Sequence, residues 1–145
     1  MQVEPQLTPG IILSDLVIRE GGSNKLSLIG CFQRFHFPKF PAQTGRWFAT
    51  VGVTGIRDAN KFNVTGRIEV GESAHVVSST NALVEFKSKS DQTIRPEMIF
   101  EVPLPFNRVV FQDAGQYVVV VLVDTEEVGR RTLAVAPITQ SVGGE

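Results

Sequence analysis

The sequence predicts an all-β protein, a single antiparallel β-sandwich of about eight strands. Apolar residues recur with a period of two over short runs, and Gly, Pro, Asn, Asp and Ser bound these runs. No segment shows the 3.6-residue period of an amphipathic helix. A succession of strands without intervening helices favours a sandwich or a barrel over an alternation of strands and helices.

The clearest strand covers residues 62–70. Apolar and polar residues alternate along it, so one face should lie on a core and the other in water. Gly66 interrupts the apolar face, and either a bulge or a close neighbouring side chain would explain it. The other expected strands are residues 11–19, 25–32, 47–53, 82–87, 98–104, 116–124 and 131–136.

Two glycine-containing connections predict hairpins. Residues 20–24 join the first two strands and residues 125–129 join the last two, and glycine permits the tight turns that hairpins need. The run 118–123 is apolar at both parities, so we expect its strand to be central and covered on both faces.

The chain has 145 residues, a length for which one core suffices. We expect a flexible segment at residues 1–10, the sandwich at residues 11–137 and a flexible tail at residues 138–145.

Charge and hydropathy predict a cytoplasmic protein without nucleic-acid or membrane partners. Fourteen Lys and Arg against fifteen Asp and Glu give a net charge of −1, which provides no global field toward phosphates or anionic lipid. The longest apolar run, residues 118–123, is too short to span a membrane. Cys31 is the single cysteine, so no intrachain disulfide can form, and residues 1–10 lack the pattern of a signal peptide.

No pattern predicts a catalytic, cofactor-binding or metal site. The two histidines, His36 and His75, have no partners at metal-ligand spacing. Ser73 and Ser78 flank His75, but a Gly-x-Ser-x-Gly turn that would expose a nucleophile is missing. The glycines at 21 and 22 lack the spacing of a phosphate-binding loop. We therefore expect a protein that is not an enzyme.

Residues 35–47 are rich in aromatic side chains for a connection between strands. Two prolines should keep this segment out of a central ladder. Its aromatic residues either plug the open end of the sandwich or form a docking surface. The candidate surface residues are Phe35, Phe37, Phe40 and Trp47.

The stretch 113–119, Asp-Ala-Gly-Gln-Tyr-Val-Val, resembles the Asp-x-Gly-x-Tyr-x-Cys signature of immunoglobulin-like domains. The resemblance implies an immunoglobulin-like sandwich with a tyrosine corner, in which the Tyr117 hydroxyl bonds to upstream backbone and Asp113 and Gly115 shape the turn. Val119 stands where those domains usually have a cysteine. The disulfide between their two sheets therefore cannot form here.

A second resemblance rests on the amino-terminal part of the chain. Leu13-x-Asp15, Glu20-Gly-Gly, the run 25–32 and the aromatic segment 37–41, taken with Gly115-x-Tyr117, are similar to a family of uncharacterised bacterial single-domain proteins. This resemblance covers nearly the whole chain and implies no activity.

These observations lead to two functional hypotheses. The first is a non-enzymatic structural or protein-interaction module, a homo-oligomer or a subunit of a larger assembly, with an unidentified protein partner or a second copy of itself. The second is a small-ligand-binding sandwich whose pocket is bordered by residues 35–47.

Overall fold

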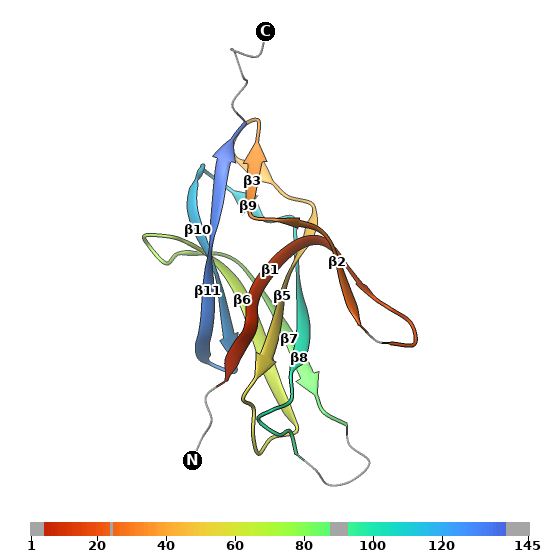
Figure 1. Ribbon diagram of the computed structural model, residues 1–145. Helices are drawn as coiled ribbons and strands as arrows, with labels where there is room; N and C mark the ends of the chain where they lie inside the picture. The colour runs from red at the N-terminus through yellow and green to blue at the C-terminus, as the bar shows by residue number, and fades with distance from the viewer. Residues whose placement is uncertain (1–4, 24, 88–92, 139–145) are drawn as a thin grey trace.

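The computed structural model describes residues 5–23, 25–87 and 93–138, and in this part of the chain the regular structure is all β. Eleven strands follow one another within these residues (Figure 1). Their bounds are β1 Gln6–Arg19, β2 Leu26–Phe32, β3 Arg34–Phe37, β4 Ala42–Gln43, β5 Arg46–Thr54, β6 Lys61–Val70, β7 Val76–Glu85, β8 Phe100–Asn107, β9 Val110–Phe111, β10 Gly115–Val123 and β11 Glu126–Pro137.

The strands form two principal sheets. One has the order β2-β1-β5-β8, the other has the order β3-β11-β10-β6-β7, and β4 and β9 pair separately. Neighbouring strands are antiparallel except for β3, which pairs in parallel with β11. The all-β prediction is thus confirmed, whereas the predictions of eight strands and of an entirely antiparallel arrangement are wrong.

The three additional strands are short. β3, β4 and β9 contain four, two and two residues, which is too little for a period of two to be recognised. β3 ends just before Pro38 and lies at the edge of its sheet, so the aromatic segment contributes a short edge strand and no central one. β1 begins at Gln6, five residues before the expected start of the domain.

Each sheet turns an apolar face toward a shared core. The first sheet contributes Leu13, Val51 and Leu104, and the second contributes Val64, Val121 and Leu133, all of them buried. β10 lies between β6 and β11, as expected for a central strand. The second face of β10 is fully covered at Val120, while Val118 and Leu122 stay partly exposed.

The two sheets approach each other on both sides, with β1 beside β11 on one and β8 beside β7 on the other. On the side where β1 and β11 meet, the Arg131 guanidinium of β11 donates to the Ile11 carbonyl of β1 at 2.5 Å and also to the Gln33 side chain. On the other side, β8 and β7 are the outer strands of their sheets. β1 curves strongly between these sides, so the first sheet is curled and not flat (Figure 1).

Within the described residues, the structure contains no helix of the length and hydropathy required to cross a bilayer.

Gly66 is explained by close packing. The register with β10 continues through Gly66 without a shift, which excludes a bulge toward that strand. A Cβ atom at this position would lie 2.9 Å from Leu104 Cδ1 and 3.3 Å from Phe106 Cζ. Any side chain at this position would therefore have to displace Leu104, which is fully buried in the core.

We expect Gly66→Val to lower the free energy of unfolding by about 1–3 kcal/mol, because the larger side chain overpacks the contact with β8. Chemical denaturation measures the change. Gly21→Ala is the matched control, since a Cβ atom there meets nothing within 4 Å. Equal stability of the two variants would contradict this account of Gly66.

Candidate functional site

The four aromatic residues singled out from the sequence lie together. The Phe35 ring is 5.3 Å from the Trp47 ring and 5.7 Å from the Phe37 ring, measured between centroids. Phe40 packs edge-on against Phe37 at 6.0 Å. They come from β3, the segment after it and the start of β5, and they form one cluster at an end of the core.

The cluster packs inward. Trp47 is only 1% exposed and stacks on Phe106 with centroids 4.7 Å apart. The three phenylalanines are half-buried and pack against the core. The geometry favours the core plug over the docking surface, because a partner cannot reach Trp47 and meets only the outer edges of the phenylalanines.

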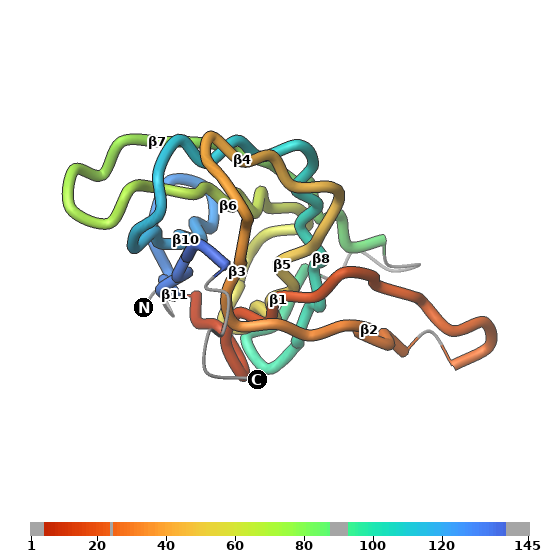
Figure 2. The backbone as a smooth tube through the Cα atoms, turned by 90° about the horizontal axis from the view of Figure 1, so that it is seen from above, coloured from red at the N-terminus to blue at the C-terminus, as the bar shows by residue number. Residues whose placement is uncertain are grey.

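A different surface carries the exposed aliphatic residues. The pairing of β1 with β5 ends at Ser14, whereas the pairing of β1 with β2 continues to Arg19 and Leu26. Residues 15–19 and 26–30 therefore form a two-stranded ribbon, here termed the β1–β2 arm. The arm projects from the body of the molecule in both views (Figures 1 and 2).

Both faces of the β1–β2 arm are apolar. On one face Leu16 lies opposite Ile29 and is followed by Ile18, with 53%, 46% and 46% of these side chains exposed. On the other face Val17 lies opposite Leu28, and both are half-buried. An isolated two-stranded ribbon is marginally stable in water and is normally covered by a further strand or a helix. The exposed side chains of the arm have no such cover within the described residues.

Gly30 sets the point where the arm leaves the sheet. Its φ of +70° is in the left-handed region, and a Cβ atom there would lie 2.5 Å from the Asp15 carboxylate. This φ favours glycine, and a side chain at this position would also have to displace the Asp15 carboxylate. Nearby, the buried Ser14 hydroxyl donates to the Leu16 carbonyl at 3.1 Å and stabilises the same bend.

The sequence contains a signal for the arm. Residues 16–18 are Leu-Val-Ile and residues 26–29 are Leu-Ser-Leu-Ile, so both strands are apolar at both parities. In the run 118–123 the same pattern marks a central strand. Pattern alone cannot distinguish a strand that its own chain covers from one that projects uncovered.

The turn before β10 is held by Tyr117. The Tyr117 hydroxyl donates to the Asp113 carbonyl at 2.6 Å, and the ring packs edge-on against Phe111 with centroids 4.8 Å apart. Asp113 lies in this turn, and Gly115 is the first residue of β10. The bond fixes the path of the chain where it enters the central strand.

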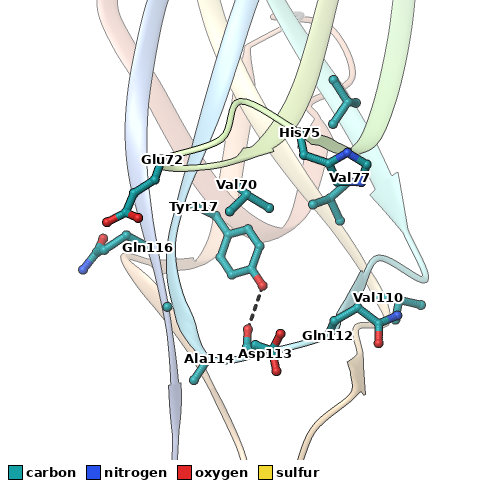
Figure 3. A pocket seen from close by; sticks show the side chains of 12 residues that line it. Val70, Glu72, His75, Val77, Val110, Gln112, Asp113, Ala114, Gln116 and Tyr117 are labelled. Carbon is teal, nitrogen blue, oxygen red and sulfur yellow. Dashed lines mark hydrogen bonds between the residues drawn. The ribbon is translucent and has the colours of Figure 1, made fainter.

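A cavity of about 650 Å³ opens beside Tyr117, between the β6–β7 hairpin and the turn before β10 (Figure 3). Val70, Val77 and Val110 give it apolar walls, while His75 and Asp113 approach it from opposite sides (Figure 3). Its lining comes from residues 70–77 and 110–117. This cavity therefore lies beside the Tyr117 turn, and residues 35–47, the expected pocket wall, do not line it.

Several residues that could carry chemistry have structural contacts. The Ser73 hydroxyl accepts a hydrogen bond from the backbone N–H of His75 at 3.3 Å, which places it in a turn. Arg130 forms a two-pronged ion pair with Glu127, at 2.7 and 2.9 Å, and this hydrogen bonding lowers the pKa of the Glu127 carboxyl. The described residues contain no group of three or more His, Cys, Asp or Glu side chains arranged to hold a metal ion.

A family profile matches residues 10–136, nearly the whole described core. The chain belongs to DUF6941, a family of unknown function. The match agrees with the resemblance to an uncharacterised family seen in the sequence. A search of curated proteins gave no match.

Among solved structures, this DUF6941 chain is similar to the Pseudomonas fluorescens alkylpurine DNA glycosylase AlkC bound to DNA containing an abasic site analogue. The identity is 12% and the TM-score 0.38, and the match covers 87% of this chain but 30% of the glycosylase. The expectation of no nucleic-acid partner is corrected here, because this neighbour is bound to DNA. A likeness of this strength assigns no DNA binding to the chain.

We expect Tyr117→Phe to lower the free energy of unfolding by about 1 kcal/mol, because the Asp113 carbonyl loses its hydrogen-bond donor. Urea denaturation measures the loss. Asp113→Asn is the control, since the acceptor is a backbone oxygen that this substitution retains. The assignment would be wrong if Tyr117→Phe were as stable as the wild type.

Proposed function

We propose that the chain is a non-enzymatic protein-interaction module that binds its partner through the β1–β2 arm. The observation that carries this proposal is the exposure of Leu16, Ile18 and Ile29 side by side on a ribbon that projects from the body.

The energetics support a docking role for the arm. Covering the exposed half of one Leu or Ile side chain contributes about 1 kcal/mol. Covering the three on one face would therefore contribute about 3 kcal/mol before any hydrogen bonds are counted. Contacts between strands add main-chain hydrogen bonds along the free edge of β2.

The non-enzymatic part of the proposal is supported by what the reactive groups do. Ser73 stabilises a turn, Arg130 pairs with Glu127, and Arg131 fastens β11 to β1. Each of these side chains already has a structural contact, and none is directed at a common point where a substrate could react.

Two further proposals concern the fold family and the cellular compartment. We infer kinship with immunoglobulin-like domains, supported by the bond from the Tyr117 hydroxyl to backbone four residues upstream. We also infer a cytoplasmic location, supported by a single cysteine, which cannot form a disulfide within the chain.

We expect Leu16→Glu to weaken the retention of a protein partner more than about tenfold, because a carboxylate on the arm must lose its hydration when the arm is covered. The measurement is the capture of proteins from a cell lysate by the immobilised full chain. Ile138→Glu is the matched control, an equally exposed aliphatic residue just after β11. Equal capture by the two variants would count against the arm.

A second candidate function is the binding of a small molecule in the cavity beside Tyr117. The supporting observation is the combination of valine walls with the Asp113 carboxylate at one side (Figure 3). These surfaces suit a small apolar molecule that carries one amine or another hydrogen-bond donor.

If the cavity binds such molecules, a screen of small aromatic amines should yield compounds that raise the melting temperature. A compound at 100 times its Kd stabilises the protein by about 2.7 kcal/mol. Val110→Phe should abolish the shift, since Val110 lies exposed at the cavity mouth and a phenyl ring would fill it. A screen without any shift, or a shift that persists in Val110→Phe, argues against this function.

A further inference from the structure

We infer that the occupant of the β1–β2 arm is a second copy of this chain, with β2 of each copy pairing with β7 of the other in a closed two-fold dimer. The inference deepens the proposed interaction function and rests on it. It follows from the four strands that end the two principal sheets, which are β2 and β8 in one sheet and β3 and β7 in the other.

Two of these four edges are protected against pairing. β8 carries Pro103 and Pro105, both on the same side of the strand, and its ladder with β5 continues past them. Proline occurs in a strand where its missing N–H points away from the ladder, so the outer edge of β8 lacks two donors. β3 is four residues long and carries Arg34 and His36. Short and charged edges resist the addition of another strand.

The other two edges lack these protections. β2 contains neither proline nor a charged residue, and β7 contains no proline and a single charged residue, Glu85, at its end. Neither strand repels the other electrostatically, and both expose aliphatic side chains. Leu83 on β7 is 54% exposed, a fraction comparable to that of Ile29 on β2.

The donor and acceptor edges lie on the same side of the molecule. Arg19 of the arm borders a groove of about 500 Å³ whose other walls are residues 82–85 of β7 and residues 99–103 around the start of β8. Both views show the arm extending on the side where β7 ends and β8 begins (Figures 1 and 2). A two-fold axis beside this groove lets each copy give its arm and receive the other, which closes the assembly at two chains.

The test is the mass of the purified full chain in solution, measured by sedimentation or light scattering up to about 100 μM chain. We expect a dimer for the wild type. Ile29→Lys on β2 and Leu83→Glu on β7 should each raise the dimer dissociation constant at least about 100-fold, because each directs a charge into an apolar contact. Ile138→Lys, outside both edges, should remain dimeric. Circular dichroism and melting temperature establish that each variant is folded.

Mixing the two single variants identifies which edges meet. A mixed pair joins the intact β2 of Leu83→Glu to the intact β7 of Ile29→Lys, and its other contact brings a lysine to a glutamate. The mixture should therefore form a dimer that neither variant forms alone. Retention of the dimer by Leu83→Glu alone would show that the dimer does not use the β7 edge and would overturn the inference.

The outcomes separate this inference from the proposed function. A wild-type chain that stays monomeric at the highest concentration overturns the second copy as the occupant. The proposed function survives that result if Leu16→Glu still loses a protein captured by the wild type. It fails if a monomeric chain also captures the same proteins with and without the substitution.

Discussion

Burial of one apolar face from each sheet against the other is the constraint on which the rest of this fold depends. The core residues of the two sheets interlock, and Gly66 keeps a side chain out of the place that Leu104 and Phe106 occupy. The sheets come together at the β1 and β11 side, where Arg131 donates to the Ile11 carbonyl, and also where β8 lies beside β7. The aromatic cluster fills one end of the core. The Tyr117 ring packs against Phe111 and holds the turn before β10 in place.

The sequence predicts most of the long strands because each one has a covered and an uncovered face. The alternation in residues 62–70 and the double parity of residues 118–123 have structural counterparts in β6 and β10. The prediction fails where pairing depends on distant parts of the chain. β3 pairs with β11, about a hundred residues later in the chain. The two-residue strands β4 and β9 are defined only by the hydrogen bonds between them.

The candidate site shows a different limit. The aromatic residues were identifiable by type, but their burial depends on rings from β8 and β9, such as Phe106 and Phe111, which sequence proximity does not reveal. The arm illustrates the converse case. Leu16 and Val121 both lie in runs that are apolar at both parities. Val121 lies between two neighbouring strands, whereas Leu16 lies beyond the last pair that β1 forms with β5.

Gly30 connects the local geometry of the arm to the history of the family. The direction of the ribbon depends on a backbone conformation that a side chain would disfavour and on contact with Asp15. The exposed aliphatic residues of the arm, Leu16, Ile18 and Ile29, have no such backbone requirement. Their identity is constrained only by the surface that they contact. In an alignment of DUF6941 sequences, glycine should therefore persist at this position while the residues of the ribbon change together with those of the surface that receives it.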